Sequence, residues 1–454
     1  MLSSPQLADE LKGRVIEPGD PDYDGARAVF PGAVDRKPSA IVRVADATDV
    51  ARVIAHARAS GLELAVRSGG HSTAGHSVTE GGIVLDLTDM RALEIDPESR
   101  TAWAETGLTA GVYTAAAGGH GLATGFGDTG SVGIGGITLG GGVGFLVRKH
   151  GLTIDDLLAA EVVSADGELL YADAETHPDL FWAIRGGGGN FGVATRFKFR
   201  LHPVESFVGG ILFLPATPDV VASFVAESEA APEELSTIAN VMPAPPLPFL
   251  PEEHHGKLVV MAMLAYAGDA DDGERAITPF RALATPIADM VRPMTYPEMY
   301  PPDDEEYRPL AVAKTMFVDS FGLGAAETAI ERIQASSAMM AVTQIRVLGG
   351  AMARVPADAT AFAHRGSRIM VNVAALYQSP DELPVHEAWV DGLADELLQD
   401  DRGAYVGFLA DEGEGRVRAA YPGPTWDRLR RVKRRYDPDN LFRLNQNIPP
   451  ADAS

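Results

Sequence analysis

One hexapeptide, Arg67-Ser68-Gly69-Gly70-His71-Ser72, combines a cation, an imidazole and two hydroxyls with two glycines. It follows the mostly apolar segment Leu62 to Val66, which is typical of a strand. Consecutive backbone N–H groups beyond a strand form a nest for anions such as phosphate oxygens. This histidine loop (residues 67–72) therefore indicates an anion site, although a tight turn with a surface histidine has the same signature.

Two glycine-rich segments strengthen that interpretation. Thirteen of the 27 residues from Gly118 to Gly144, the long glycine segment, are glycine, and Gly186 to Gly192, the short glycine segment, follows. Glycine allows positive φ and a close approach of backbone to ligand, at a cost in chain entropy. We expect backbone packed against a large planar ligand and its pyrophosphate, with a purely structural loop as the alternative.

Several other chemistries lack their motifs. No register gives G-x-G-x-x-G between a strand and a helix, and there is no G-x-x-x-x-G-K-[ST], which disfavours a Rossmann site and a P-loop. Gly70 to Ala74 falls one residue short of the nucleophile elbow of hydrolases. His254, His255 and His364 lack metal-binding spacing, so no metal site is predicted.

Composition narrows the function classes further. A formal charge of -25 disfavours nucleic acid and anionic lipid as partners. The absence of cysteine excludes disulfides, thiolate metal sites and cysteine nucleophiles. Met1 to Asp20 shows no secretory signal, and the longest apolar run, Leu258 to Ala267, is shorter than the roughly 18–20 residues that cross a bilayer. We therefore expect a cytoplasmic protein that acts on a small molecule, and the oligomeric state stays open.

Short helices and strands must position these motifs. A helix over 46–60 with Thr48 as its cap and Gly61 as its stop, a helix over 109–120, and a hairpin at Asp166-Gly167 predict an α+β fold rather than a regular parallel sheet. Further strands over 211–214, 258–266, 343–348 and 369–375 indicate a second domain, and a basic helix over 426–435 reads as a solvated face. We place the boundaries at 1–205, 206–405 and 406–454.

The ordered motifs resemble a known family. The motif segments are Val66 to Ser72, Gly133 to Gly144, Arg148 to Leu152, Phe181 to Val193 and Tyr436 to Pro450. They resemble the berberine-bridge-enzyme-like branch of the vanillyl-alcohol-oxidase superfamily of FAD-linked oxidoreductases, which includes 6-hydroxynicotine oxidases and polyketide-tailoring flavoenzymes. The match runs in order from about residue 30 to the C-terminus and is weak only over 206–340.

The resemblance implies a fold and a cofactor. It implies a PCMH-type FAD-binding domain of two α+β subdomains, completed by the C-terminal segment, and a substrate domain with an antiparallel sheet covered by helices. His71 stands at the position of the histidine that bonds to the flavin 8α carbon. The other implied FAD contacts are Arg67, Ser68, Gly69, Gly70 and Ser72, then Asp128, Thr129, Gly133, Ile134, Gly135, Gly136 and Ile137, with Val193 near the adenine and Asn445 and Asn447 returning to the flavin.

Departures from the family pattern leave the proton acceptor open. Thr129 stands where many members carry a second flavin-linking cysteine, Gly407 replaces an asparagine, and Gln344 replaces a carboxylate used as base. We expect hydride transfer from a C–H beside a hydroxyl or amine to flavin N5, with reoxidation by O2. Tyr405 is the first candidate for the base if its pKa is lowered, and His150 and Arg346 follow. A dehydrogenase with another acceptor, or an FAD-binding protein with little turnover, stays an alternative.

Overall fold

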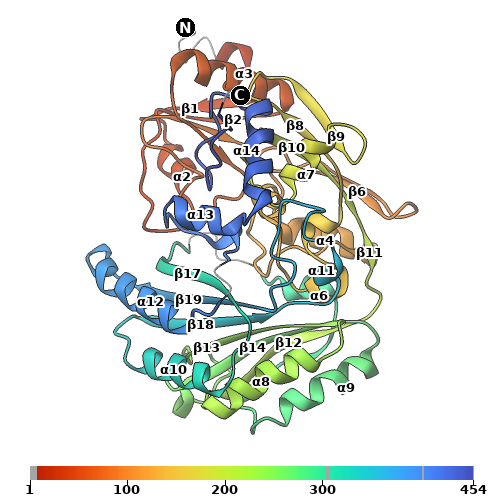
Figure 1. The fold of residues 1–454 in the computed structure, drawn as a ribbon, viewed down its shortest axis with the longest axis vertical. Helices are drawn as coiled ribbons and strands as arrows, with labels where there is room; N and C mark the ends of the chain where they lie inside the picture. Colours follow the sequence, from red (N-terminus) through yellow and green to blue (C-terminus); the bar gives the residue numbers. More distant parts are fainter. Residues whose placement is uncertain (1–7, 303–306, 401–402, 453–454) are drawn as a thin grey trace.

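A computed structural model describes residues 8–302, 307–400 and 403–452, which form two α+β subdomains, a large-sheet domain and a C-terminal segment (Figure 1). The α+β fold that the sequence predicts is confirmed, with an antiparallel large sheet covered by helices. Among the described residues, no helix is both long and apolar enough to span a membrane.

The first subdomain holds a four-stranded sheet in the order β1-β2-β4-β3, in which β2, β4 and β3 run parallel. Its elements are β1 (Arg14–Ile16), α2 (Tyr23–Arg27), β2 (Ala40–Arg43), α3 (Ala47–Ser60), β3 (Leu64–Arg67) and β4 (Ile83–Asp86). Asp46, not Thr48, caps α3, because its carboxylate accepts the N–H groups of Thr48 and Asp49. Gly61 ends the helix at φ 67°, as expected.

The second subdomain holds an antiparallel sheet in the order β5-β6-β10-β8-β9. Its strands are β5 (Leu93–Asp96), β6 (Thr101–Glu105), β8 (Leu157–Val163), β9 (Leu169–Asp173) and β10 (Val193–Arg200), beside the pair β7 (Leu122–Ala123) and β11 (His202–Pro203). Its helices are α4 (Ala110–Gly118), α5 (Ile134–Gly140), α6 (Val147–His150), η1 (Thr153–Asp155) and α7 (Pro178–Ile184). The hairpin predicted at Asp166-Gly167 joins β8 to β9.

The large-sheet domain is built on an eight-stranded antiparallel sheet, with β15-β12-β14-β13-β18-β19-β17 in order and β16 beside β12. The strands are β12 (Phe207–Pro215), β13 (Leu235–Pro243), β14 (Leu258–Ala267), β15 (Ala288–Asp289), β16 (Arg292–Met294), β17 (Leu310–Val318), β18 (Met340–Val347) and β19 (Ile369–Tyr377). The predicted strands over 211–214, 258–266 and 369–375 fall within β12, β14 and β19, and the one over 343–348 overlaps β18, which ends one residue earlier.

Helices cover one face of the large sheet, and the opposite face looks toward the two subdomains (Figure 1). The covering helices are α8 (Pro218–Ala230), α9 (Ala270–Arg281), α10 (Leu323–Gln334) and α12 (Leu383–Leu397). Successive strand residues alternate between faces, so Ile345 and Val371 pack under the helices. Met370 instead joins a cluster with Val143 and Tyr405 on the opposite face.

The C-terminal segment returns to the second subdomain. It contains the short helix η5 (Val406–Phe408), α13 (Glu414–Ala420) and α14 (Pro424–Tyr436), and α14 lies against α7. The interpretation of α14 as a solvated basic face is wrong for Lys433, whose side chain is fully buried and paired with Asp437 at 2.7 Å. An ammonium in such a place persists because a carboxylate and two carbonyls replace its water.

Candidate functional site

The histidine loop and the long glycine segment meet backbone to backbone. A Cβ added to Gly133 would lie 2.2 Å from the backbone N of Gly69 and 2.2 Å from Oγ of Ser68. Ser68 Oγ donates to the carbonyl of Thr106 at 2.5 Å and accepts the N–H of Gly135 at 3.3 Å. Glycine is required here because no side chain fits between the two loops.

Parallel strands set the histidine loop in place. Arg67 ends β3 in register with Asp86 at the end of β4, and the two side chains form a buried ion pair at 2.7 Å. The guanidinium of Arg67 is therefore engaged by Asp86 through Nη2, and its contact with a pyrophosphate stays a prediction. The guanidinium of Arg67 can be buried because the carboxylate of Asp86 balances its charge.

The imidazole of His71 stacks on Phe30, with ring centroids 4.3 Å apart and 17° between the planes. Phe30 itself donates its N–H to the carbonyl of Gly70 at 3.0 Å, and Gly70 adopts φ 74°. Ser72 Oγ accepts the N–H of His76 at 3.2 Å. The ring of His71 is thus oriented by an aromatic partner from a distant part of the first subdomain, which sequence reasoning missed.

The short glycine segment is tied to the C-terminal segment through Asn190. Its Nδ2 donates to the carbonyl of Gln446 at 3.1 Å, and its Oδ1 accepts the N–H of Ile448 at 3.0 Å. The buried ammonium of Lys433 donates to the carbonyls of Asn190 and Phe442, at 2.8 Å and 3.2 Å. These contacts hold the segment around Asn445 and Asn447 against the glycine-rich backbone.

Three residues expected to contact the cofactor, Asn445, Asn447 and Val193, have different surroundings. Asn445 lies over Gly189, where an added Cβ would be 3.0 Å from its Oδ1, and Asn447 Oδ1 is buried with no hydrogen-bond partner among the described residues. An orphaned buried acceptor of this kind fits a missing ligand donor. The side chain of Val193 is instead buried in the core of the first subdomain, so its contact with an adenine stays a prediction.

The Tyr405 hydroxyl is fully enclosed, and it accepts the N–H of Gly142 at 3.0 Å. Burial raises the pKa of Tyr405 above its ordinary value, which is opposite to the lowered pKa that a phenolate base would need. The condition for Tyr405 as base is therefore not met. Gly407 is required beside it, because an added Cβ would lie 2.8 Å from the Tyr405 ring and 2.9 Å from its hydroxyl.

Arg346 joins the large sheet to the long glycine segment. Its Nη2 donates to Oδ2 of Asp128 at 2.5 Å, and Nε and Nη2 both donate to Oε1 of Gln344. The guanidinium lies over the ring of Phe408, 5.2 Å from the centroid. Thr129 Oγ donates to Oδ1 of Asp128 at 3.3 Å. Arg346 thus reaches the predicted flavin loop, where it is paired with the carboxylate of Asp128.

His150 lies apart from that group. Its ring stacks on His202 with centroids 3.8 Å apart, and His202 contacts the buried carboxylate of Asp156 at 2.7 Å. Burial first, then the neighbouring His202 and Lys149, lowers the pKa of His150 to about 3. The imidazole is therefore neutral at neutral pH, but no described contact joins it to Tyr405 or Arg346.

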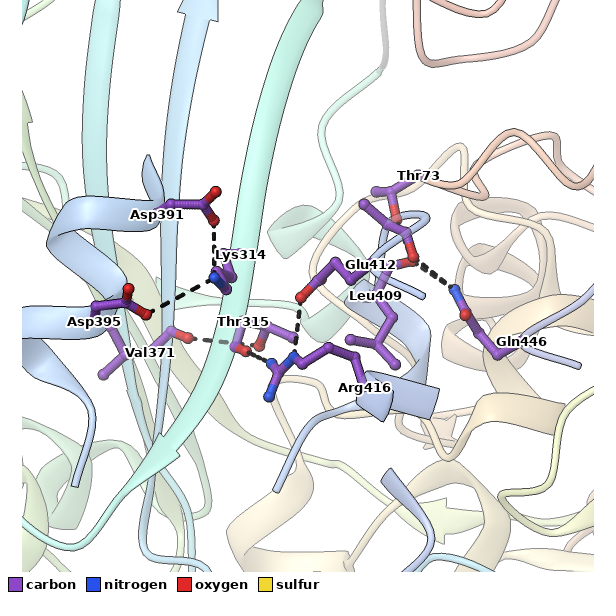
Figure 2. A network of polar contacts seen from close by, with 11 residues as sticks. Thr73, Lys314, Thr315, Val371, Asp391, Asp395, Leu409, Glu412, Arg416 and Gln446 are labelled. Atoms are coloured by element: carbon purple, nitrogen blue, oxygen red, sulfur yellow. Dashed lines mark hydrogen bonds and ion pairs between the residues drawn. The ribbon is translucent and has the colours of Figure 1, made fainter. Parts of the chain in front are cut away.

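The C-terminal segment also links Thr73, the residue that follows the histidine loop, to the edge of the large sheet (Figure 2). Thr73 and Gln446 both donate to the carbonyl of Leu409, at 2.9 Å and 2.8 Å. Arg416 donates to the carbonyl of Thr315 in the edge strand β17 and pairs with Glu412. The chain directly after the histidine loop and the large sheet are therefore connected through residues 409–416.

The close approach of Gly69 to Gly133, which we call the glycine cradle, and the orphaned Asn447 fit a dinucleotide cofactor, and comparisons with known proteins agree. Residues 38–173 match the FAD binding domain model, and residues 404–449 match the berberine and berberine-like model. (R)-6-hydroxynicotine oxidase of Paenarthrobacter nicotinovorans is 30% identical over 97% of both chains. The chain belongs to the berberine-bridge-like family of FAD-linked oxidoreductases. Its enzyme class is therefore that of the FAD-linked oxidases and dehydrogenases.

Two further relatives extend the comparison for this berberine-bridge-like oxidoreductase. Xylooligosaccharide oxidase of Thermothelomyces thermophilus is 28% identical over 92% of this chain and 88% of its own. The crystal structure of 6-hydroxy-D-nicotine oxidase from Arthrobacter nicotinovorans superposes with a TM-score of 0.87 at 27% identity, covering 97% of this chain and 99% of that one. The similarity spans both the FAD-binding part and the large-sheet domain.

Proposed function

We propose that this FAD-linked oxidoreductase carries its flavin on a single covalent bond from His71 to the 8α carbon and oxidises a C–H beside a hydroxyl or an amine. When bound, FAD would supply the hydride acceptor for this oxidation at its N5 atom, and we propose O2 as its reoxidant. The contact of Ser68 and Gly69 with Gly133 is the observation that supports the proposal, because it brings the loop that carries His71 against the long glycine segment. The sequence has no cysteine, which leaves no thiol for a second flavin bond.

The chain's own residues have distinct tasks in this proposal. Gly69 and Gly133 bring two backbones together, and Phe30 orients the His71 ring. Asn445 and Asn447, held by Asn190 and its neighbours, offer amides to the flavin. Such fixed placement of the cofactor against the substrate is the part of catalysis that the protein supplies.

We propose Asp128 as the group that accepts the proton from the substrate hydroxyl or amine. Its carboxylate lies at the long glycine segment, and the guanidinium of Arg346 holds Oδ2 in place. Tyr405, with its raised pKa, keeps its proton at neutral pH. Positioning of a base by a fixed partner is a common feature of general base catalysis.

Anaerobic mixing of the purified holoenzyme with alcohols and amines tests the redox function. We expect at least one donor class to bleach the visible flavin absorbance, and air to restore it with formation of hydrogen peroxide. Dithionite serves as the control that the flavin is reducible. Bleaching by dithionite alone would contradict the function and favour a flavin-binding protein without turnover. Recovery only with an artificial acceptor would contradict O2 as the oxidant.

A further inference from the structure

A row of neutral polar side chains crosses the large sheet on the face that looks toward the FAD-binding part. Asn240 on β13 pairs with Gln344 on β18, Gln344 pairs with Asn372 on β19, and Asn372 pairs with Thr315 on β17. The neighbours of Asn372 along β19, Val371 and Val373, pack under the helices. Because strand residues alternate between faces, Asn372 shares the opposite face with Arg346.

Of the four residues in this row, Asn372 is the one whose side chain makes no hydrogen bond to the part of the chain that the structure describes. Gln344 Nε2 donates to Asn240 Oδ1 at 2.9 Å, and Gln344 Oε1 accepts from Arg346. Thr315 Oγ donates to the carbonyl of Val371 at 3.5 Å. Asn372 Oδ1 is buried and has no partner. A buried acceptor is normally satisfied, so this atom points to a donor supplied from outside the chain.

A second polar group stands on the same face nearby. Met370 is the cross-strand partner of Arg346, so Asn372 and Arg346 are diagonal neighbours, with roughly 7–8 Å between such positions. The Nε and Nη2 donors of Arg346 are used by Gln344 and Asp128, whereas Nη1 makes no hydrogen bond to the described residues. A molecule between the two would meet one donor, at Nη1, and one acceptor, at Oδ1.

Apolar side chains flank this polar row on the same face of the sheet. Met261 stands beside Asn240 across β14, and Val342 and Met340 continue the same face of β18. All three are only partly buried. Flexible methionines adapt to flat or irregular apolar molecules. The charge of Arg346 is balanced by Asp128, so the site demands no anionic ligand.

We propose that Asn372 determines substrate specificity by accepting a hydrogen bond from a second hydroxyl or N–H of the substrate. The substrate class is a small, flat and largely apolar alcohol or amine that carries this extra donor, with an oxygen or nitrogen toward Arg346 Nη1. The inference rests on the proposed function, because the alcohol or amine to be oxidised is taken from it. A site built to receive a donor discriminates against analogues that lack it.

Matched aromatic alcohols test this proposal in the holoenzyme. 4-Hydroxybenzyl alcohol has the extra donor, and 4-methoxybenzyl alcohol keeps the shape without it. Binding is measured anaerobically by the perturbation of flavin absorbance and, independently of the flavin, by calorimetry. We expect the wild type to bind the hydroxy compound about tenfold to a hundredfold more tightly, the cost of one unmet hydrogen bond at a partly buried site.

Variants at Asn372 separate recognition from folding. Asn372→Leu should bring the two affinities to within about threefold of each other, whereas Asn372→Asp, which keeps an acceptor, should retain the preference. Gln378→Leu, the same change of amide to leucine at an exposed position just beyond β19, should keep the wild-type ratio.

Three outcomes would overturn the assignment. These are equal binding of the two compounds by the wild type, an undiminished preference in Asn372→Leu, and no binding of either compound at millimolar concentration. Failure of the redox function looks different: the preference persists in calorimetry while no donor bleaches the flavin.

Discussion

Arg346 donates a hydrogen bond to Asp128 across 218 residues of sequence and 2.5 Å of space. One partner lies on the large sheet and the other in the long glycine segment, so the pair fixes the sheet against the FAD-binding loop. Arg346 is almost fully buried and Asp128 is about four-fifths buried. An ion pair in this environment is sensitive to the loss of either partner.

We predict strong coupling between Arg346 and Asp128. Arg346→Met and Asp128→Asn should each lower kcat and stability, but the double variant should lose less stability than the sum, by about 1–3 kcal/mol. Denaturant unfolding of the holoenzyme measures this cycle. The exposed pair Arg292–Glu298 is the control and should couple by less than about 1 kcal/mol. Additive losses at Arg346 and Asp128 would show that the contact carries no energy.

We predict that Gly133→Ala separates the histidine loop from the long glycine segment. The added Cβ would lie 2.2 Å from Gly69 N, so the loops must move apart, and the purified protein should contain little flavin and unfold at a lower temperature. Gly136→Ala is the control for stability, because its Cβ meets no atom within 4 Å. Alanine at this helical position should preserve or raise stability by up to about 1 kcal/mol. Equal losses of stability in the two variants would contradict the loop contact.

We predict that Lys433 stabilises the segment that carries Asn445 and Asn447 through its buried contacts and not as a surface charge. Lys433→Met leaves the buried carboxylate of Asp437 without its cation and should cost about 3–5 kcal/mol of stability. Arg434→Met, one residue along on the exposed face, should change stability by less than about 0.5 kcal/mol. Urea unfolding compares the two. A small effect at Lys433 would mean that the C-terminal segment is held by other contacts.

We predict that His150 makes the protein sensitive to acid. The pKa of its imidazole is about 3 in the folded chain and 6.5 in an unfolded one, so only the unfolded chain takes up this proton between those values. The free energy of unfolding should therefore fall as the pH drops from about 6.5 toward 5, by at most about 1.4 kcal/mol per pH unit. His150→Phe keeps a ring against His202 and should flatten this slope. An unchanged slope in this variant would contradict the burial of His150.

Local patterns explain why much of the fold was predictable. The hairpin at Asp166-Gly167 and the end of α3 at Gly61 depend on the conformations of a few neighbouring residues, and both are as expected. The cap of α3 moved from Thr48 to Asp46 because a carboxylate two residues earlier competes for the same N–H groups. Such shifts of an element's end are ordinary where several capping residues are adjacent.

Long-range contacts explain what the sequence could not supply. The histidine and glycine motifs indicated the predicted cofactor loops. The hydrogen bond to the Tyr405 hydroxyl, however, comes from Gly142, 263 residues away. The sequence suggests that Lys433 is a surface cation, because only the fold brings the carbonyl of Asn190, 243 residues earlier, to its ammonium beside Asp437. Asp86 pairs with Arg67 because the parallel strands β3 and β4 place the two residues opposite each other. Covalent flavin, the adenine contact of Val193 and a cytoplasmic location stay predictions.

The flavin bond to His71 is tested most directly by the mass and colour of the denatured protein. We predict that the intact chain exceeds the mass of its polypeptide by one FAD, and that the acid-precipitated protein stays yellow. His71→Ala should lose both properties, while His76→Ala, in the same stretch of chain, should keep them. A polypeptide of unmodified mass that releases all its colour on denaturation, or a His71→Ala protein that retains the added mass, would contradict the account.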